Sequence, residues 1–215
     1  KRIKNIVIPD SVTEIGEKAF NSCKNLTDLV IPDSVTTIGE GAFSWCEGLI
    51  ELKIPESVTE IKVHVFYFCT NLTSVSIPNS VTKIGKEAFY FCKNLASVAI
   101  PDSVTEIEEG AFSECKKLKS VTLSHSLTEI GKRVFGFCVE LSSVTIPNSI
   151  RKIGPGSFGF CQILTTITIP DSVTSMANGC FTFCSSLTSV VIPDSITSLP
   201  IDCFNGCSGL TSIII

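Results

Sequence analysis

The residues of this chain best suited to chemistry are its eleven cysteines, which could in principle hold a metal or form disulfides. No Cys-x-x-Cys pair occurs and only two histidines are present, so the spacing argues against a zinc site. Cysteines stacked at a constant interval have parallel side chains, whose Cβ atoms lie too far apart for a disulfide. We expect reduced, buried thiols that cap a helical turn in nine of them. We call these nine the cysteine column; they recur every 23 residues, at positions 23, 46, 69, 92, 115, 138, 161, 184 and 207.

The other two cysteines, Cys180 and Cys203, stand in a different column, directly before a phenylalanine, where several repeats have alanine. They are also 23 residues apart, so stacked repeats would make them neighbours. A disulfide between them and a pair of reduced thiols both fit this pattern.

No catalytic set can be assembled from the remaining polar residues. His64 and His125 stand at unrelated repeat positions, and no glycine-rich phosphate-binding motif occurs. A column that runs from Asp10 through Asp102 to Asp194 carries, apart from His125, acidic or amide side chains that could hold Ca²⁺. Each repeat offers only one such side chain, however, and turns favour aspartate and asparagine in any case. We therefore predict no enzyme, no metal site and no cofactor.

The 23-residue interval that positions these residues extends through the whole chain and determines the fold. Phenylalanine recurs without a gap from Phe20 to Phe204, and leucine from Leu26 to Leu210. In the repeat at residues 32–54, V-T-T-I predicts an extended piece and A-F-S-W-C has the spacing of a helical turn. The segment L-I-E-L-K-I ends in the alternation of a strand, and the next proline marks a corner.

Stacking of the repeats follows from their small size, since one repeat alone buries too little apolar surface to offset the entropy of ordering it. Stacked turns share a continuous interior and lie about 4.8 Å apart. We predict a single domain over residues 1–215, in which residues 1–8 are a partial repeat and residues 9–215 are nine 23-residue repeats.

The pattern I-P-x-S-V-T-x-I-G-x-x-A-F-x-x-C-x-x-L-T-S-V resembles the BspA-type leucine-rich repeat of surface proteins from anaerobic bacteria and protists. The resemblance implies an α/β solenoid, a right-handed leucine-rich-repeat superhelix. A parallel sheet would form its concave face, with short strands and single helical turns on the other side. It also implies a cell-surface or secreted location, although the sequence is compatible with a cytoplasmic one. The implied partner is an extracellular-matrix or cell-surface protein.

One candidate binding surface is the concave strand face, where small polar residues alternate with buried ones. It could lie close to a partner backbone or a glycan, and it equally fits a sheet of β-favouring residues that binds nothing. Its predicted residues are Asp28, Glu51, Lys53, Ser74, Ser76, Ser97, Ser120, Thr122, Ser143, Thr145, Thr166, Thr168 and Ser189.

A second candidate surface is a convex aromatic stripe at the position just before the cysteine column. More rings stand there than the core requires, and an exposed stripe of this kind indicates a partner contact. The alternative is that the rings fold over the neighbouring turn and are half-buried. The stripe, interrupted by Glu114, consists of Trp45, Phe68, Phe91, Phe137, Phe160 and Phe183.

The net charge and the short apolar runs argue against nucleic acid and the membrane interior as partners. The net charge of −4 argues against nucleic acid, and no apolar run approaches the ~20 residues that span a bilayer. Because the chain begins within one repeat and ends within a strand, we expect a segment of a longer protein that could associate end to end. The favoured function is a protein-interaction or adhesion module, and the alternative is a structural spacer or self-assembling rod.

Overall fold

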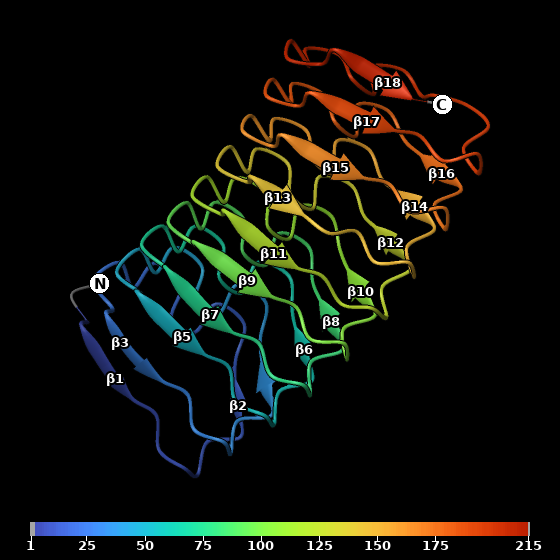
Figure 1. Cartoon of the computed structure of the whole chain (residues 1–215). Coiled ribbons are helices and arrows are strands. Elements are labelled where there is room, and N and C mark those ends of the chain that lie inside the picture. The colour runs from blue at the N-terminus through green and yellow to red at the C-terminus, as the bar shows by residue number, and fades with distance from the viewer. Residues whose placement is uncertain (1–2, 215) are drawn as a thin grey trace.

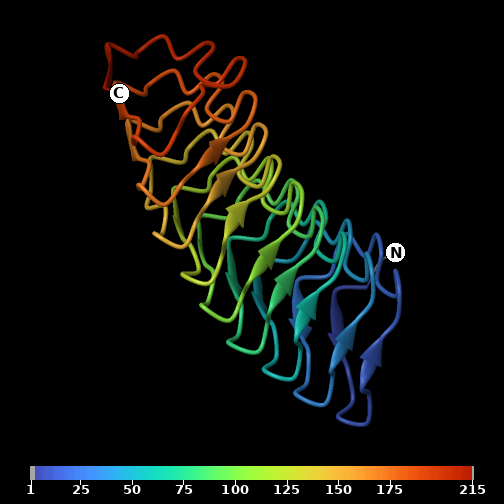
Figure 2. The same cartoon turned by 90° about the vertical axis from the view of Figure 1, so that its right-hand side faces the viewer.

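The computed structural model describes residues 3–214 as an elongated stack of turns, with the two ends of the chain at opposite ends of the stack (Figures 1 and 2). All strand pairs are parallel and join residues 23 positions apart, as Leu52 and Val75 do. This confirms a parallel-strand solenoid of about nine 23-residue turns. The right-handed sense of the superhelix and the concave position of one sheet stay predictions.

One series of strands forms what we call the long-strand face. It pairs in the groups β1–β3, β5–β7, β9–β11–β13 and β15–β17–β18. In strands such as β5, β11 and β15 the central residue points inward and its neighbours point to solvent, which is the alternation that a half-buried sheet requires. All three residues of β18 are exposed. The strands are β1 (Asn5–Val7), β3 (Asp28–Val30), β5 (Glu51–Lys53), β7 (Ser74–Ser76), β9 (Ser97–Ala99), β11 (Ser120–Thr122), β13 (Ser143–Val144), β15 (Thr166–Thr168), β17 (Ser189–Val191) and β18 (Ser212–Ile214).

A second series of two-residue strands follows the proline corner and forms a separate face of the solenoid (Figure 1). Each of these strands places its second residue in the interior. They pair in the groups β2–β4, β6–β8–β10 and β12–β14–β16. The strands are β2 (Glu14–Ile15), β4 (Thr37–Ile38), β6 (Glu60–Ile61), β8 (Lys83–Ile84), β10 (Glu106–Ile107), β12 (Glu129–Ile130), β14 (Lys152–Ile153) and β16 (Ser175–Met176).

The prediction of a helical turn after each short strand is wrong, because residues 3–214 contain no helix and this segment consists of tight turns. The cause is the direction of its hydrogen bonds. The N–H groups of Phe43 and Trp45 donate to Val65 and Tyr67 of the next turn, whereas that of Cys46 donates back to Phe43. A backbone that gives every second N–H to its neighbour cannot form the i→i−4 bonds of a helix.

The interior is organised around a row of stacked phenylalanines. Their rings lie nearly parallel with centroids 5.1–5.8 Å apart, from the Phe20–Phe43 pair to the Phe181–Phe204 pair. The seven rings from Phe43 to Phe181 are fully buried. The row confirms that equivalent residues of successive turns lie in register.

The cysteine column is buried and reduced, and its thiols have a specific role. From Cys46 to Cys207, each Sγ donates to the carbonyl of the phenylalanine 26 residues earlier, at 3.1–3.4 Å. Burial raises the pKa of thiols such as Cys69 and Cys115 well above the ordinary value, which keeps them protonated as donors. Cysteine therefore links adjacent turns through a weak hydrogen bond as well as filling space.

Candidate interaction surfaces

The long-strand face carries the predicted polar residues at its surface. All thirteen are exposed except Ser189, which is half-buried. The hydroxyl-bearing members form a set that we call the hydroxyl face. Within the described chain, none of their hydroxyl groups makes a hydrogen bond. The set consists of Ser74, Ser76, Ser97, Ser120, Thr122, Ser143, Thr145, Thr166, Thr168 and Ser189.

Hydroxyl groups elsewhere on the solenoid are used to hold turns together. The Ser80 Oγ donates to the carbonyl of Val58 at 2.7 Å, and the Ser103 Oγ repeats this bond one turn later. The Thr73 Oγ1 and the Thr188 Oγ1 donate to carbonyls 23 residues earlier, at 3.0 and 3.2 Å. The chain thus distinguishes structural hydroxyl groups from those of the hydroxyl face, which are directed at solvent.

The first turns of the same face carry charge and exposed apolar side chains. Asp28, Glu51 and Lys53 occupy β3 and β5, and Val30 beside them is 75% exposed. A cavity of about 860 Å³ borders Val30 and Lys53, and its lining is largely aliphatic. The face therefore changes along its length from a charged, partly apolar end to an uncharged array of hydroxyl groups.

The predicted aromatic stripe consists of two stacks of three rings. Trp45, Phe68 and Phe91 stack with centroids 4.0 and 4.5 Å apart. Phe137, Phe160 and Phe183 form the second stack at 4.3 and 4.7 Å. All are half-buried except Phe183, which is 44% exposed. Because the ring faces are turned towards each other, the stripe presents ring edges to solvent rather than a flat platform.

The backbone of this column adopts an unusual conformation that the sequence does not reveal. The six aromatic residues have φ between 55° and 63°, in the left-handed region that side chains other than glycine rarely adopt. A second left-handed residue stands four positions earlier in each turn and includes His64, Glu87 and Arg133. The sequence indicates the second column only in part, since four of its nine positions are glycine, and it hardly indicates the first, where Gly206 is the single glycine.

Glu114 separates the two stacks at a small cavity. The cavity measures about 190 Å³ and lies between Tyr90 on one side and Phe137 on the other. Lys116 approaches the Phe91 ring at 5.4 Å and the Glu114 carboxylate at 3.4 Å. Desolvation, followed by the charge of Glu114, raises the pKa of Tyr90. The space thus suits a side chain rather than a larger ligand.

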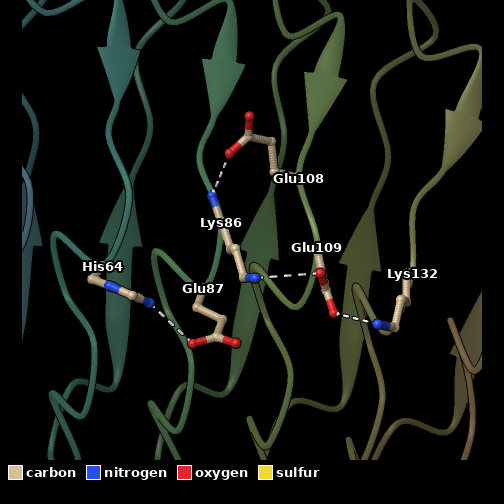
Figure 3. Close-up of polar contacts among 6 residues, drawn as sticks. All are labelled: His64, Lys86, Glu87, Glu108, Glu109 and Lys132. Atoms are coloured by element: carbon tan, nitrogen blue, oxygen red, sulfur yellow. Dashed lines mark hydrogen bonds and ion pairs between the residues drawn. The ribbon is translucent and has the colours of Figure 1, made fainter.

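A charged belt runs across the middle turns and connects residues 22 to 25 positions apart (Figure 3). Glu109 accepts from Lys86 at 3.4 Å and from Lys132 at 2.8 Å, so one carboxylate joins three turns. Glu108 accepts from the backbone N–H of Lys86 and also pairs with Lys83. The Lys83 and Lys132 side chains hold the pKa values of Glu108 and Glu109 below the ordinary value.

The two histidines have partners that repeat positions alone did not predict. His64 Nε2 lies 3.0 Å from the Glu87 carboxylate in the belt, and His125 Nδ1 lies 3.0 Å from Asp102. The signal that could have found them is an acidic residue 23 positions away. Neither pair includes a nucleophile, and each contact is a hydrogen bond between side chains of adjacent turns.

The column from Asp10 to Asp194, whose side chains could hold Ca²⁺, lies at exposed corners. Asp102 there accepts the backbone N–H of His125 at 2.7 Å, which lowers its pKa. Within residues 3–214, no group of three or more His, Cys, Asp or Glu side chains could hold a metal ion. The same residues contain no helix that is long and apolar enough to cross a membrane.

These features define the class of the protein as a leucine-rich-repeat solenoid, a scaffold whose variable surface columns stand on a constant interior. The profile of the BspA type leucine-rich repeat region matches residues 1–119 and 82–211, with six copies. The chain belongs to the BspA-type leucine-rich repeat family. No curated protein is significantly similar to it.

Several solved bacterial structures are similar to this chain. A leucine-rich repeat protein from Bacteroides ovatus is 28% identical, with a TM-score of 0.81, and the match covers 99% of this chain and 61% of that one. The T. pallidum leucine-rich repeat protein is 32% identical at a TM-score of 0.71, covering 76% and 79%. A leucine-rich cell surface protein from Faecalibacterium prausnitzii is 28% identical at 0.57, covering 99% and 73%.

Proposed function

We propose that this chain is a non-enzymatic protein-interaction module, which presents its hydroxyl face to a protein partner outside the cell. The supporting observation is that ten hydroxyl side chains share one face and none of them bonds within the described chain. Hydroxyl groups in other columns, such as that of Ser80, serve the fold instead. A face of unused donors and acceptors is available to a partner.

The chemistry of this face suits an extended protein segment. Equivalent hydroxyl groups recur at the strand spacing of about 4.8 Å, which offers a regular series of donors and acceptors along the stack. Ser97, Ser120 and Thr122 are small, so a partner backbone can approach the sheet closely. Asp28, Glu51 and Lys53 at the first turns would fix the direction of the partner by charge.

One relative supports a location for this chain at the cell surface. The F. prausnitzii protein is described as a cell surface protein. We infer a cell-surface or secreted location and a partner of the extracellular-matrix or cell-surface class. A role in adhesion would place the hydroxyl face, rather than a pocket, at the contact.

Binding by variants of the hydroxyl face tests this proposal. The variant Thr122→Arg/Thr145→Arg/Thr168→Arg places three large cations on the face. We expect its affinity for a partner, found in a panel of immobilised extracellular-matrix proteins by biolayer interferometry, to fall at least about tenfold. The matched control carries arginine at Thr59, Thr105 and Thr128, in an exposed column that already contains Arg151.

Two results would contradict the proposal. One is the absence of binding to every protein of the panel, and the other is an equal loss in the face variant and the control. A folded circular-dichroism spectrum for both variants excludes loss of structure as the cause.

The second candidate function is a rigid spacer or self-assembling rod. The uninterrupted phenylalanine row favours it, since a continuous core makes the turns one elongated body. The aromatic stripe would then provide contacts between copies. Light scattering decides between the two functions, because a rod that assembles gains mass with concentration, whereas an interaction module stays monomeric.

A further inference from the structure

The eleven cysteines fall into two structural classes. Thiols of the cysteine column, from Cys46 onward, each donate to a phenylalanine carbonyl of the preceding turn, which keeps their side chains parallel. Cys180 and Cys203 have no such acceptor, and their sulfur atoms converge to 3.2 Å from each other. Both thiols are free and buried, at 0% and 4% exposure.

The two sulfur atoms lie near enough to each other for a disulfide to form after a small movement. Formation of the bond requires the gap to close to about 2.05 Å, a shift that side-chain rotation can supply. The column itself does not require cysteine, because Ala42, Ala88 and Ala111 fill the same position elsewhere and are fully buried.

The turn that contains Cys203 is tied less completely to its neighbour than the turns before it. In the preceding turn, the N–H groups of Thr174 and Ala177 donate to Arg151 and Ile153, both at 2.9 Å. The corresponding residues are Thr197, which makes no such bond in the described chain, and Pro200, which has no N–H. Accordingly, no two-residue strand follows β16 among the described residues.

Apolar residues in the same turn, between positions 194 and 203, are also poorly buried. Leu199 is 46% and Ile201 is 72% exposed. Residues 194–203 thus combine missing ladder bonds with poor burial, the features of a segment that opens locally. Such opening would expose Cys203, the last residue of the segment.

From these observations we propose that Cys180 and Cys203 are an oxidisable dithiol, whose disulfide ties the last two turns together where the backbone ladder is interrupted. The oxidant is a low-molecular-weight disulfide. The Cys203 thiolate attacks it, forms a mixed disulfide and releases one thiolate. The Cys180 thiolate then attacks the Cys203 sulfur and expels the second. Two thiols lose their protons and become one disulfide, while the oxidant is reduced to two thiols.

The order of attack follows from the environment of each sulfur. The hydrogen bond to Cys203 and burial both raise the pKa of Cys180, so this thiol is the poorer first nucleophile. Cys203 is the more exposed of the two and lies in the loosely tied turn. Burial keeps column thiols such as Cys138 protonated, whereas contact with Cys184 lowers the pKa of Cys207 to about 7. Cys207 is therefore a competing nucleophile, which the Cys184→Ala/Cys207→Ala control removes.

Oxidation of the 215-residue protein with oxidised glutathione at mildly alkaline pH tests the proposal. Denaturation, alkylation and peptide mapping should show that alkylatable thiols fall from eleven to nine, with Cys180 linked to Cys203. Amide hydrogen exchange of residues 194–203 should slow at least about tenfold, because the cross-link opposes local opening.

Two variants provide matched controls. Cys203→Ala introduces the residue that fills this column in the buried positions of Ala42, Ala88 and Ala111, so it should fold and show no slowing of exchange under oxidation. Cys184→Ala/Cys207→Ala removes another pair 23 residues apart and should leave both the cross-link and the slowing intact.

The proposal is overturned if eleven thiols remain alkylatable in the oxidised wild-type protein, or if the cross-link maps to another pair. Unchanged exchange over residues 194–203 in the cross-linked protein would overturn the stated role of the bond. These readouts do not involve the hydroxyl face, so the proposal stands or fails independently of the proposed function.

Discussion

The middle turns, residues 60–140, and the C-terminal turns, residues 153–214, share one backbone ladder but differ in how side chains support it. In the middle turns, Lys83, Lys86 and Lys132 pair with glutamates of adjacent turns. The C-terminal turns contain no lysine or arginine, so no such belt can form there. These turns depart from the repeat pattern at Met176, at Cys180 and in the segment around Pro200.

The comparison shows that the interior specifies this fold and the exterior only adjusts it. Phe112 in the middle turns and Phe158 in the C-terminal turns are both fully buried, and their stacking distances to the next ring are nearly equal, 5.8 and 5.5 Å. Stability in a stack of this kind is a sum of turn-to-turn interfaces. Surface columns can therefore change from charged to neutral without loss of the solenoid.

The largest expected effect tests whether the two interiors are equivalent. Phe112→Ala and Phe158→Ala should each lower the free energy of unfolding by about 3–5 kcal/mol, because each leaves a large cavity between two rings. Urea denaturation followed by circular dichroism measures both. If Phe158→Ala lowered the free energy of unfolding by less than half as much as Phe112→Ala, the two interiors would not be equivalent. The C-terminal turns would then be packed more loosely.

An intermediate effect is expected for the aromatic stripe, which has one stack in each region. Phe91→Ser and Phe160→Ser should retain the fold and each lose about 1–2 kcal/mol, as expected for half-buried stacked rings. Urea denaturation again provides the measurement. Failure to fold would place these rings in the core, and no loss at all would mean that the stacks contribute nothing.

Two further variants of Phe91 test the backbone conformation of the stripe. Because Phe91 has φ of 59°, Phe91→Gly should be less destabilising than Phe91→Ala by about 1 kcal/mol, the reverse of the usual order. The usual order, with glycine the worse of the two, would show that the left-handed conformation is not adopted in solution.

The sequence predicts the register of this molecule well because buried columns leave a direct trace. Phe20, Phe43 and Phe66 recur at one interval, and only an in-register stack buries them all. The same interval pairs Leu52 with Val75 in neighbouring strands. Composition and period therefore determine the strands, the core and the exposed face.

The turn segments and the polar pairs between turns could not be predicted in the same way. The spacing of Phe43 and Cys46 fits a helical turn and a tight turn equally, and the choice depends on hydrogen bonds to the next turn. His64 becomes a partner of Glu87 only when turns are stacked. The hydrogen bonds of the cysteine column likewise need the position of a carbonyl 26 residues away.

The smallest expected effect concerns the charged belt. Because of the belt, the stability of the middle turns should depend on pH more than that of the C-terminal turns. Glu108 and Glu109 have pKa values lowered in the fold from the ordinary 4.5, so the unfolded chain binds protons more readily than the folded one. Their contribution is present above pH 4.5 and is lost as the pH falls through the lower, folded values. Because the pairs are largely exposed, each should contribute less than about 1 kcal/mol.

Hydrogen exchange measured by region at pH 7 and at pH 3, corrected for the intrinsic rates, isolates this effect. Protection should decrease in the middle turns and stay nearly constant in residues 153–192, which lack the belt. The Lys83→Met/Lys132→Met variant should show the middle-turn loss already at pH 7, since it removes the cations that lower the two pKa values. An equal pH response in both regions would mean that protonation acts on the whole solenoid and that the belt gives the middle turns no separate support.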